Sequence, residues 1–160
     1  MISWLTSTYI GKLVATFIIS MMPIVELRGG LPYGVGFGLS PLVAFAAAVL
    51  GNMLPIPFVL LLLNGILKWM KTQDNFLGKT ALWLENKAYK NKDTIEKYGS
   101  LGLMILVAIP LPGTGAWTGA LVATVLGIRP KIAFPLIFIG VLIAGIIMLT
   151  VSYGLFEVIF

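Results

Sequence analysis

Residues 23–32 read PIVELRGGLP and set two opposite charges, Glu26 and Arg28, among residues that break helices. The chain on either side of this segment is almost wholly apolar. In hydrocarbon, broken backbone and ionisable side chains are both costly, so a membrane protein keeps them together only where they line a protected cavity or pathway. Glu26 and Arg28 are therefore the first candidates for functional residues.

The composition predicts an integral membrane protein. Of the 160 residues, 59% are hydrophobic and 11% are charged, whereas soluble domains carry about 25% charged residues. The length suggests a single domain with a few membrane passes of about 20 residues each. The chain has no Cys and no His, which excludes disulfides, thiolate chemistry, His metal ligands and His-based catalysis. With no P-loop, metal-spacing motif or nucleophile elbow either, we expect no enzyme activity, no cofactor and no metal site.

The basic residues are distributed as membrane topology requires. Nine of the 11 Lys and Arg fall in residues 68–97 or at Arg129 and Lys131. By the positive-inside rule, this predicts a multi-pass protein of the cell membrane with residues 68–97 in the cytoplasm and both termini outside. Residues 1–11 carry no basic residue, so no cleaved signal peptide is expected. The net charge of +5 follows from this topology, and no nucleic acid is expected as a partner.

The first half of the chain predicts a re-entrant hairpin followed by one membrane span. The largely apolar run Leu13–Val25 has 13 residues and would be about 20 Å long as a helix, short of a core of about 30 Å. After the charged break, Leu31–Leu39 is predicted to return to the side from which the chain entered the membrane. Leu42–Leu67 is long enough to cross the membrane, with a kink near Pro55 and Pro57. Residues 68–98 then form either an amphipathic helix on the membrane surface or, in part, a solvated loop.

The second half repeats this plan. Leu101–Ile109 is predicted to enter the membrane, Pro110–Gly115 to break the helix, Ala116–Gly127 to return to the same side and Ile132–Phe156 to cross the membrane. A shift of 89 residues without a gap aligns Pro23 with Pro112, Gly30 with Gly119, Gly38 with Gly127 and Pro41 with Pro130. We therefore predict an all-α membrane domain built from repeat 1 (residues 9–67), a cytoplasmic amphipathic linker (68–97) and repeat 2 (98–156).

The two repeats are predicted to have opposite orientations. Each unit of one hairpin and one span crosses the membrane an odd number of times, so the second copy is inverted relative to the first. Inverted repeats with broken helices are a transporter plan. The alternative topology has four plain spans with Glu26 and Arg28 in a loop.

The first break is the predicted substrate site. Arg28 can grip phosphate or carboxylate in a bidentate way, Gly29 and Gly30 allow close backbone approach, and a helix starting near Leu31 would offer free N–H groups. Alternatively, Arg28 only neutralises Glu26 or caps carbonyls of the opposing hairpin. Glu26 is the predicted proton-coupling residue, because desolvation raises the pKa of a carboxylate while a nearby arginine lowers it.

The second break carries no charge. Thr114, Trp117 and Thr118 can offer hydrogen bonds to substrate, and Asn52 is a further candidate for the same cavity; packing of one hairpin against the other is the favoured role of this break. The residues predicted to break the hairpins are Pro23, Pro32, Pro110, Pro112, Gly113 and Gly115.

Two motifs carry a resemblance to a known family. They read ELRGGLPYG at residues 26–34 and PLPGTGAWTGA at residues 110–120, and in both the chain resembles the small multidrug export proteins. That family is similar in plan to the wider DedA (VTT-domain) membrane proteins, with two re-entrant hairpins and an inverted repeat. DedA proteins typically place an arginine in the second hairpin; here the tip is Gly113-Thr114-Gly115 instead.

The resemblance implies transport, since DedA relatives are associated with flipping polyprenyl-phosphate or phospholipid carriers, driven by the proton-motive force. Together with the charged break, it predicts a proton-coupled secondary transporter, a DedA-like flippase in which the two hairpins meet at mid-membrane and Arg28 holds the headgroup of an anionic lipid. The alternatives are a small-molecule or multidrug exporter, in which Glu26 dominates, and a non-transporting membrane scaffold. Membrane lipid and protons are the expected partners, and a homodimer is plausible.

Overall fold

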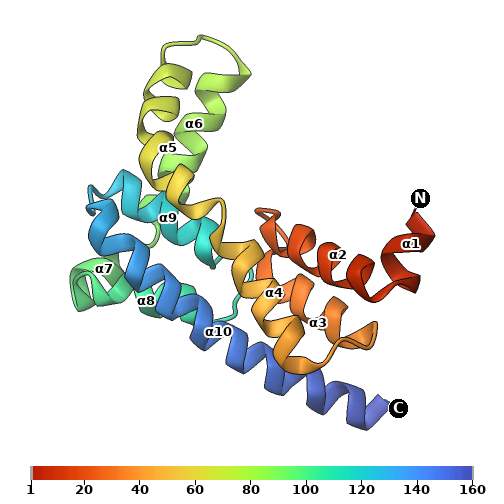
Figure 1. The fold of residues 1–160 in the computed structure, drawn as a ribbon. Helices are drawn as coiled ribbons and strands as arrows, with labels where there is room; N and C mark the ends of the chain where they lie inside the picture. Colours follow the sequence, from red (N-terminus) through yellow and green to blue (C-terminus); the bar gives the residue numbers. More distant parts are fainter. Residues whose placement is uncertain (1, 160) are drawn as a thin grey trace. The chain divides into compact units, whose positions relative to one another are not determined.

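The computed structural model describes residues 2–159, which form helices and contain no strand (Figure 1). The predicted all-α fold is confirmed for these residues. The helices are α1 (Ile2–Ser7), α2 (Tyr9–Met21), α3 (Glu26–Gly36), α4 (Pro41–Met53), α5 (Ile56–Lys71), α6 (Phe76–Tyr89), α7 (Lys92–Tyr98), α8 (Leu101–Ala108), α9 (Ala116–Val125) and α10 (Pro130–Ile159).

Two helical segments among the described residues are long and apolar enough to cross a membrane, Pro41–Lys71 and Pro130–Leu155. The first consists of α4 and α5 and has a turn at Leu54 and Pro55, where the sequence predicts a kink. The chain divides into two compact units, each described separately below: unit 1 is Met1–Pro55 with Val141–Phe160, and unit 2 is Ile56–Gly140.

In unit 1, helices α2, α3 and α4 pack against one another, with α1 against α2 (Figure 1). Close backbone approach depends on glycines. A Cβ at Gly30 of α3 would overlap the Ser20 side chain of α2, and a Cβ at Gly51 of α4 would overlap the Phe17 carbonyl. Small residues at helix crossings let membrane helices gain van der Waals contact along their backbones, so these glycines fix how the three helices sit.

In unit 2, α5 packs against α6 and α9, α6 against α9, and α8 against both α7 and α9. The salt bridge between Lys71 Nζ and Glu85 Oε1, at 2.6 Å, joins α5 to α6. Helices α6 and α7 occupy most of the predicted linker, and Gly78, Ala81 and Ala88 of α6 are buried. Residues 76–89 are thus helical rather than a solvated loop.

The two halves share helix boundaries at the offset of 89 residues. Helices α3 and α9 end at Gly36 and Val125, and both are followed by a glycine with left-handed backbone, Gly38 at φ 86° and Gly127 at φ 74°. After each glycine, the amide of the next residue donates to the carbonyl five residues earlier, over 3.0 Å in the first case and 2.8 Å in the second. This pattern is the Schellman C-cap, so α3 and α9 end with the same hydrogen-bonded motif.

The structure corrects two predicted boundaries. Pro32 does not break the first hairpin, because it lies inside α3; α3 already begins at Glu26, five residues before the predicted start near Leu31. A proline in a membrane helix removes the bond from its own nitrogen but leaves the flanking turns helical. The break itself lies at residues 22–25, between α2 and α3, and contains Pro23.

Replacing Gly51 should therefore destabilise unit 1. A Cβ at this position would lie too close to the backbone oxygen, carbonyl carbon and Cα of Phe17, and neither backbone can move aside as a flexible side chain would. We expect Gly51→Ala to cost about 1–3 kcal/mol, measured as a lower midpoint of thermal unfolding in detergent. Gly154→Ala is the matched control in α10 of the same unit. It meets nothing within 4 Å and should be neutral or stabilising by up to about 1 kcal/mol.

Candidate functional site

The first break places a carboxylate in an unusual backbone conformation. Glu26 is buried, with 4% of its surface exposed, and its φ is 53°. Among the described residues it is the one non-glycine with positive φ. The left-handed region costs an L-residue about 1–2 kcal/mol, and such strain clusters at functional sites, where the surrounding structure holds it. Burial and backbone strain together mark Glu26 as more than a surface charge.

The equivalent position in the second half clarifies this strain. Gly115 lies 89 residues after Glu26 and also has positive φ, at 131°. Glycine adopts such a backbone without steric cost. Positive φ thus occurs at the equivalent position in both halves, at different angles, and a strained carboxylate stands in one half where the other has a glycine.

Arg28 lies in the first turn of α3 and is half-buried. The predicted set of free helix amides around it is smaller than expected. The Glu26 N–H donates to the Met22 carbonyl at 2.9 Å, and the Gly29 N–H donates to the Val25 carbonyl at 3.1 Å. The Gly29 bond is the regular first bond of α3 to its N-cap residue, so the break occupies one of the N-terminal amides that a helix leaves free, that of Glu26.

The glycines after Arg28 serve packing within the unit. A Cβ at Gly29 would overlap the Val25 side chain, and one at Gly30 would overlap the Ser20 side chain. Gly30 is buried, whereas Gly29 is partly exposed. The close backbone approach at Gly30 is therefore to α2. Of the two glycines predicted to contact substrate, only Gly29 has accessible surface.

At the second break, threonine hydroxyls bond the loop itself. Thr114 Oγ1 donates within 2.8 Å of the carbonyls of Ile109 and Leu111, and Thr118 Oγ1 donates to the Gly113 carbonyl at 3.1 Å. The acceptor carbonyls lie in the break itself, between α8 and α9, where no helix provides regular amide partners. They fit the structural role favoured for this tip. Trp117, the third predicted hydrogen-bonding residue here, is half-buried.

Unit 1 has a buried polar interior that the sequence reasoning found only in part. Asn52, a predicted candidate, is 2% exposed, and Thr16 and Ser20 on α2, which were not predicted, are fully buried. The signal lay in the repeat alignment: Thr16, Ser20 and Asn52 correspond at the 89-residue offset to Ile105, Ile109 and Val141. Polar residues in one half thus replace apolar residues in the other.

The predicted site residues therefore divide between the units. Glu26, Arg28, Gly29, Gly30 and Asn52 belong to unit 1, on α3 and α4. Thr114, Trp117 and Thr118 belong to unit 2, on the break before α9 and on α9 itself. All of the predicted charge and most of the buried polar surface lie in unit 1.

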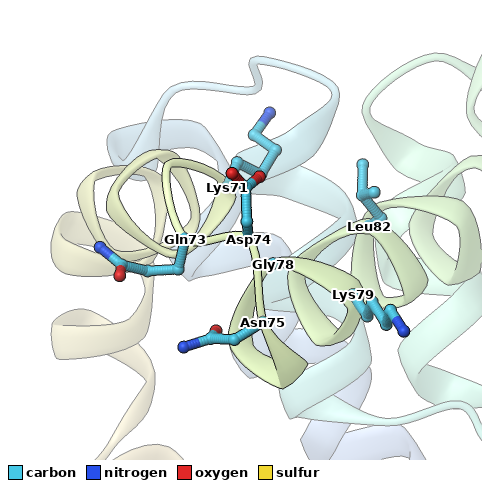
Figure 2. A pocket seen from close by; sticks show the side chains of 7 residues that line it. All are labelled: Lys71, Gln73, Asp74, Asn75, Gly78, Lys79 and Leu82. Atoms are coloured by element: carbon cyan, nitrogen blue, oxygen red, sulfur yellow. The ribbon is translucent and has the colours of Figure 1, made fainter.

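A separate depression lies at the turn between α5 and α6 in unit 2 (Figure 2). Its volume is about 470 Å³, and it is lined by Lys71, Gln73, Asp74, Asn75, Gly78, Lys79 and Leu82. The Asn75 side chain caps α6 by accepting the Leu77 N–H at 3.0 Å, and Lys71 pairs with Glu85. The depression shares no residue with the predicted site, and two of its polar side chains have structural roles.

Comparison with known families gives one match. Residues 26–147 are similar to the family model described as "Putative small multi-drug export protein". The match begins at Glu26, the first residue of α3, and includes α3 to α9, the second break and the first part of α10. The comparison with curated proteins and the comparison with solved structures each gave no match.

Proposed function

The chain belongs to the small multi-drug export protein family, and from this premise we propose that it is a proton-coupled secondary transporter whose substrate is an anionic lipid. One observation carries the proposal. Glu26 is buried and strained in a helix break, two residues before the half-buried Arg28. Intramembrane ionisable residues at broken helices line substrate and proton pathways in transporters.

The architecture of two inverted, re-entrant repeats is part of this proposal. It is supported by the shared boundaries and C-caps of α3 and α9 at the 89-residue offset. It is also supported by the lengths of α2 and α8, 13 and 8 residues, which as helices reach only about 20 and 12 Å into a core of about 30 Å.

In this mechanism the guanidinium of Arg28 binds the phosphate of the headgroup in a bidentate way. Glu26 takes up a proton on one side of the membrane and releases it on the other, which changes the net charge beside Arg28 and so the affinity for the phosphate. The DedA-like substrates, polyprenyl-phosphate and phospholipid, share this anionic headgroup.

Export of small molecules is the second candidate, and the family's own description favours it. In that case the carboxylate of Glu26 would be the substrate-binding group and would select cations.

Transport in proteoliposomes distinguishes these functions. Purified protein is reconstituted with a fluorescent polyprenyl-phosphate, a fluorescent phospholipid or a cationic dye, and a pH gradient is imposed. We expect faster movement of an anionic lipid than in empty liposomes, and loss of this acceleration when a protonophore collapses the gradient. Movement of the dye alone would favour the exporter, and movement of none of the three would favour a scaffold.

A further inference from the structure

Three buried side-chain oxygens in unit 1 lack hydrogen-bond partners among the described residues, and two of them lie near the ends of helices. These two are Ser20 Oγ on α2 and Asn52 Oδ1 on α4, and their residues are 0% and 2% exposed. A buried oxygen left unsatisfied costs about 1–3 kcal/mol, so each such atom in a native protein calls for an explanation.

Both oxygens lie on the last turn of a helix, since α2 ends at Met21 and α4 at Met53. The C-terminal end of a helix carries partial negative charge, and its last carbonyls have no intrahelical amide. After α4 this effect is extended by Pro55 and Pro57, which have no N–H to donate to the carbonyls four residues earlier. Each oxygen is therefore beside backbone groups that favour a cation.

The two helix ends lie at the same end of unit 1. Helices α2 and α3 are antiparallel, because Gly30 contacts Ser20 while Gly34 contacts Thr16. Helix α4 reverses direction again after the turn at residues 37–40. Helices α2 and α4 are thus parallel, and Gly51 in the last turn of α4 contacts Phe17, which precedes the last turn of α2.

A buried carboxylate belongs to the third helix. Glu26 begins α3 one turn before Gly30, the residue that contacts Ser20. Its carboxylate is buried. A hydroxyl, an amide oxygen, backbone carbonyls and one carboxylate make a set of ligands composed of oxygen alone, the type that hard cations prefer.

From this arrangement we propose that unit 1 binds a monovalent metal cation, Na⁺, between the C-terminal turns of α2 and α4, with Ser20 Oγ and Asn52 Oδ1 as ligands and Glu26 as the counter-charge. Divalent cations are disfavoured. No three acidic side chains come together within residues 2–159, and Arg28 adds a positive charge two residues from Glu26. Carbonyls at broken helix ends bind Na⁺ in other membrane transporters in the same way.

The second half lacks such a site at equivalent positions, because Ile109, Val141 and Gly115 stand where Ser20, Asn52 and Glu26 are found. Binding of the cation does not depend on the proposed transport. If the proposed proton-coupled transport is also correct, Na⁺ and the proton compete for the carboxylate of Glu26.

Thermal unfolding of the purified full-length protein tests the site without any transport. We expect the unfolding midpoint to rise by about 2–4 °C when about 100 mM choline chloride is replaced by NaCl, as for a ligand present at about ten times its Kd. Ser20→Ala and Asn52→Leu should each abolish this rise. Both remove an unsatisfied buried polar atom, so we expect them to fold with a midpoint in choline no lower than that of the wild type.

Ser152→Ala is the matched control. Ser152 Oγ on α10 is also buried and without a partner in the described residues, but it lies inside its helix, which continues to Ile159. This variant should keep the full response to Na⁺. Equal midpoints in Na⁺ and choline for the wild type would overturn the proposal, since the oxygens would then hold water. A response retained in both Ser20→Ala and Asn52→Leu would overturn it as well.

Discussion

Arg28→Ala should reduce transport of an anionic lipid by about 10- to 100-fold while leaving the fold intact. A hydrogen bond to a charged group contributes about 1.5–3 kcal/mol, and each 1.4 kcal/mol corresponds to a factor of ten. In the proposed function, the guanidinium of Arg28 binds the headgroup, and the N–H of Glu26 in the same turn already donates to the Met22 carbonyl. The rate of lipid movement in proteoliposomes under a pH gradient is the measurement.

Two variants control this experiment. Arg28→Lys keeps the charge but loses the planar, bidentate geometry, so it should recover only part of the rate. Arg129→Ala removes an exposed arginine before α10 and should leave the rate unchanged. If Arg28→Ala transports at the wild-type rate with an unchanged unfolding midpoint, Arg28 only neutralises charge, and the substrate site must lie elsewhere.

The sequence predicted the positions of the breaks well, because glycine and proline act locally. The second break ends and α9 begins at Ala116, the residue at which the sequence predicted this boundary. Helices α4 and α10 both begin at prolines, Pro41 and Pro130, which are related by the 89-residue offset. A proline at the first helical position has no amide to lose. Helix-breaking residues of this kind can be recognised in the sequence without any knowledge of tertiary structure.

The start of α3 and the role of Pro32 could not be predicted in the same way. Local rules favour ending a helix before proline, whereas the packing of Gly30 and Gly34 on α2 stabilises a helix that continues through it. The positive φ of Glu26 was equally hidden, since glutamate carries no propensity for it. The alignment with Gly115 offered the one available hint.

The buried polar interior of unit 1 was underestimated for a related reason. Serine and threonine are common in membrane helices and usually bond their own backbone, as Thr16 Oγ1 does with the Lys12 carbonyl at 2.8 Å. Ser20 Oγ makes no such bond to its own backbone. The absence of this bond becomes visible only in the folded structure. Sequence alone could identify it as unusual only by comparison with Ile109 in the other half.

Glu26→Gly should abolish proton-coupled transport and yet make the protein more stable. Glycine adopts the required positive φ without cost, which recovers about 1–2 kcal/mol of backbone strain, and loses about 0.5–1 kcal/mol through greater freedom of the unfolded chain. The net expectation is a gain of up to about 1.5 kcal/mol. Lipid movement under a pH gradient and the thermal unfolding midpoint are measured on the same preparation.

Two further variants separate the charge of Glu26 from its backbone. Glu26→Gln keeps the strain and the shape but cannot release a proton, so it should also lose coupling, without the gain in stability. Gly115→Ala makes the reciprocal change at φ 131°; it should cost about 1–3 kcal/mol while leaving the charged tip in place. A carboxylate that serves only structure would show the opposite pattern, with Glu26→Gly less stable than the wild type and still active. Because stability and transport are expected to move in opposite directions, the pair of measurements distinguishes a functional Glu26 from a structural one.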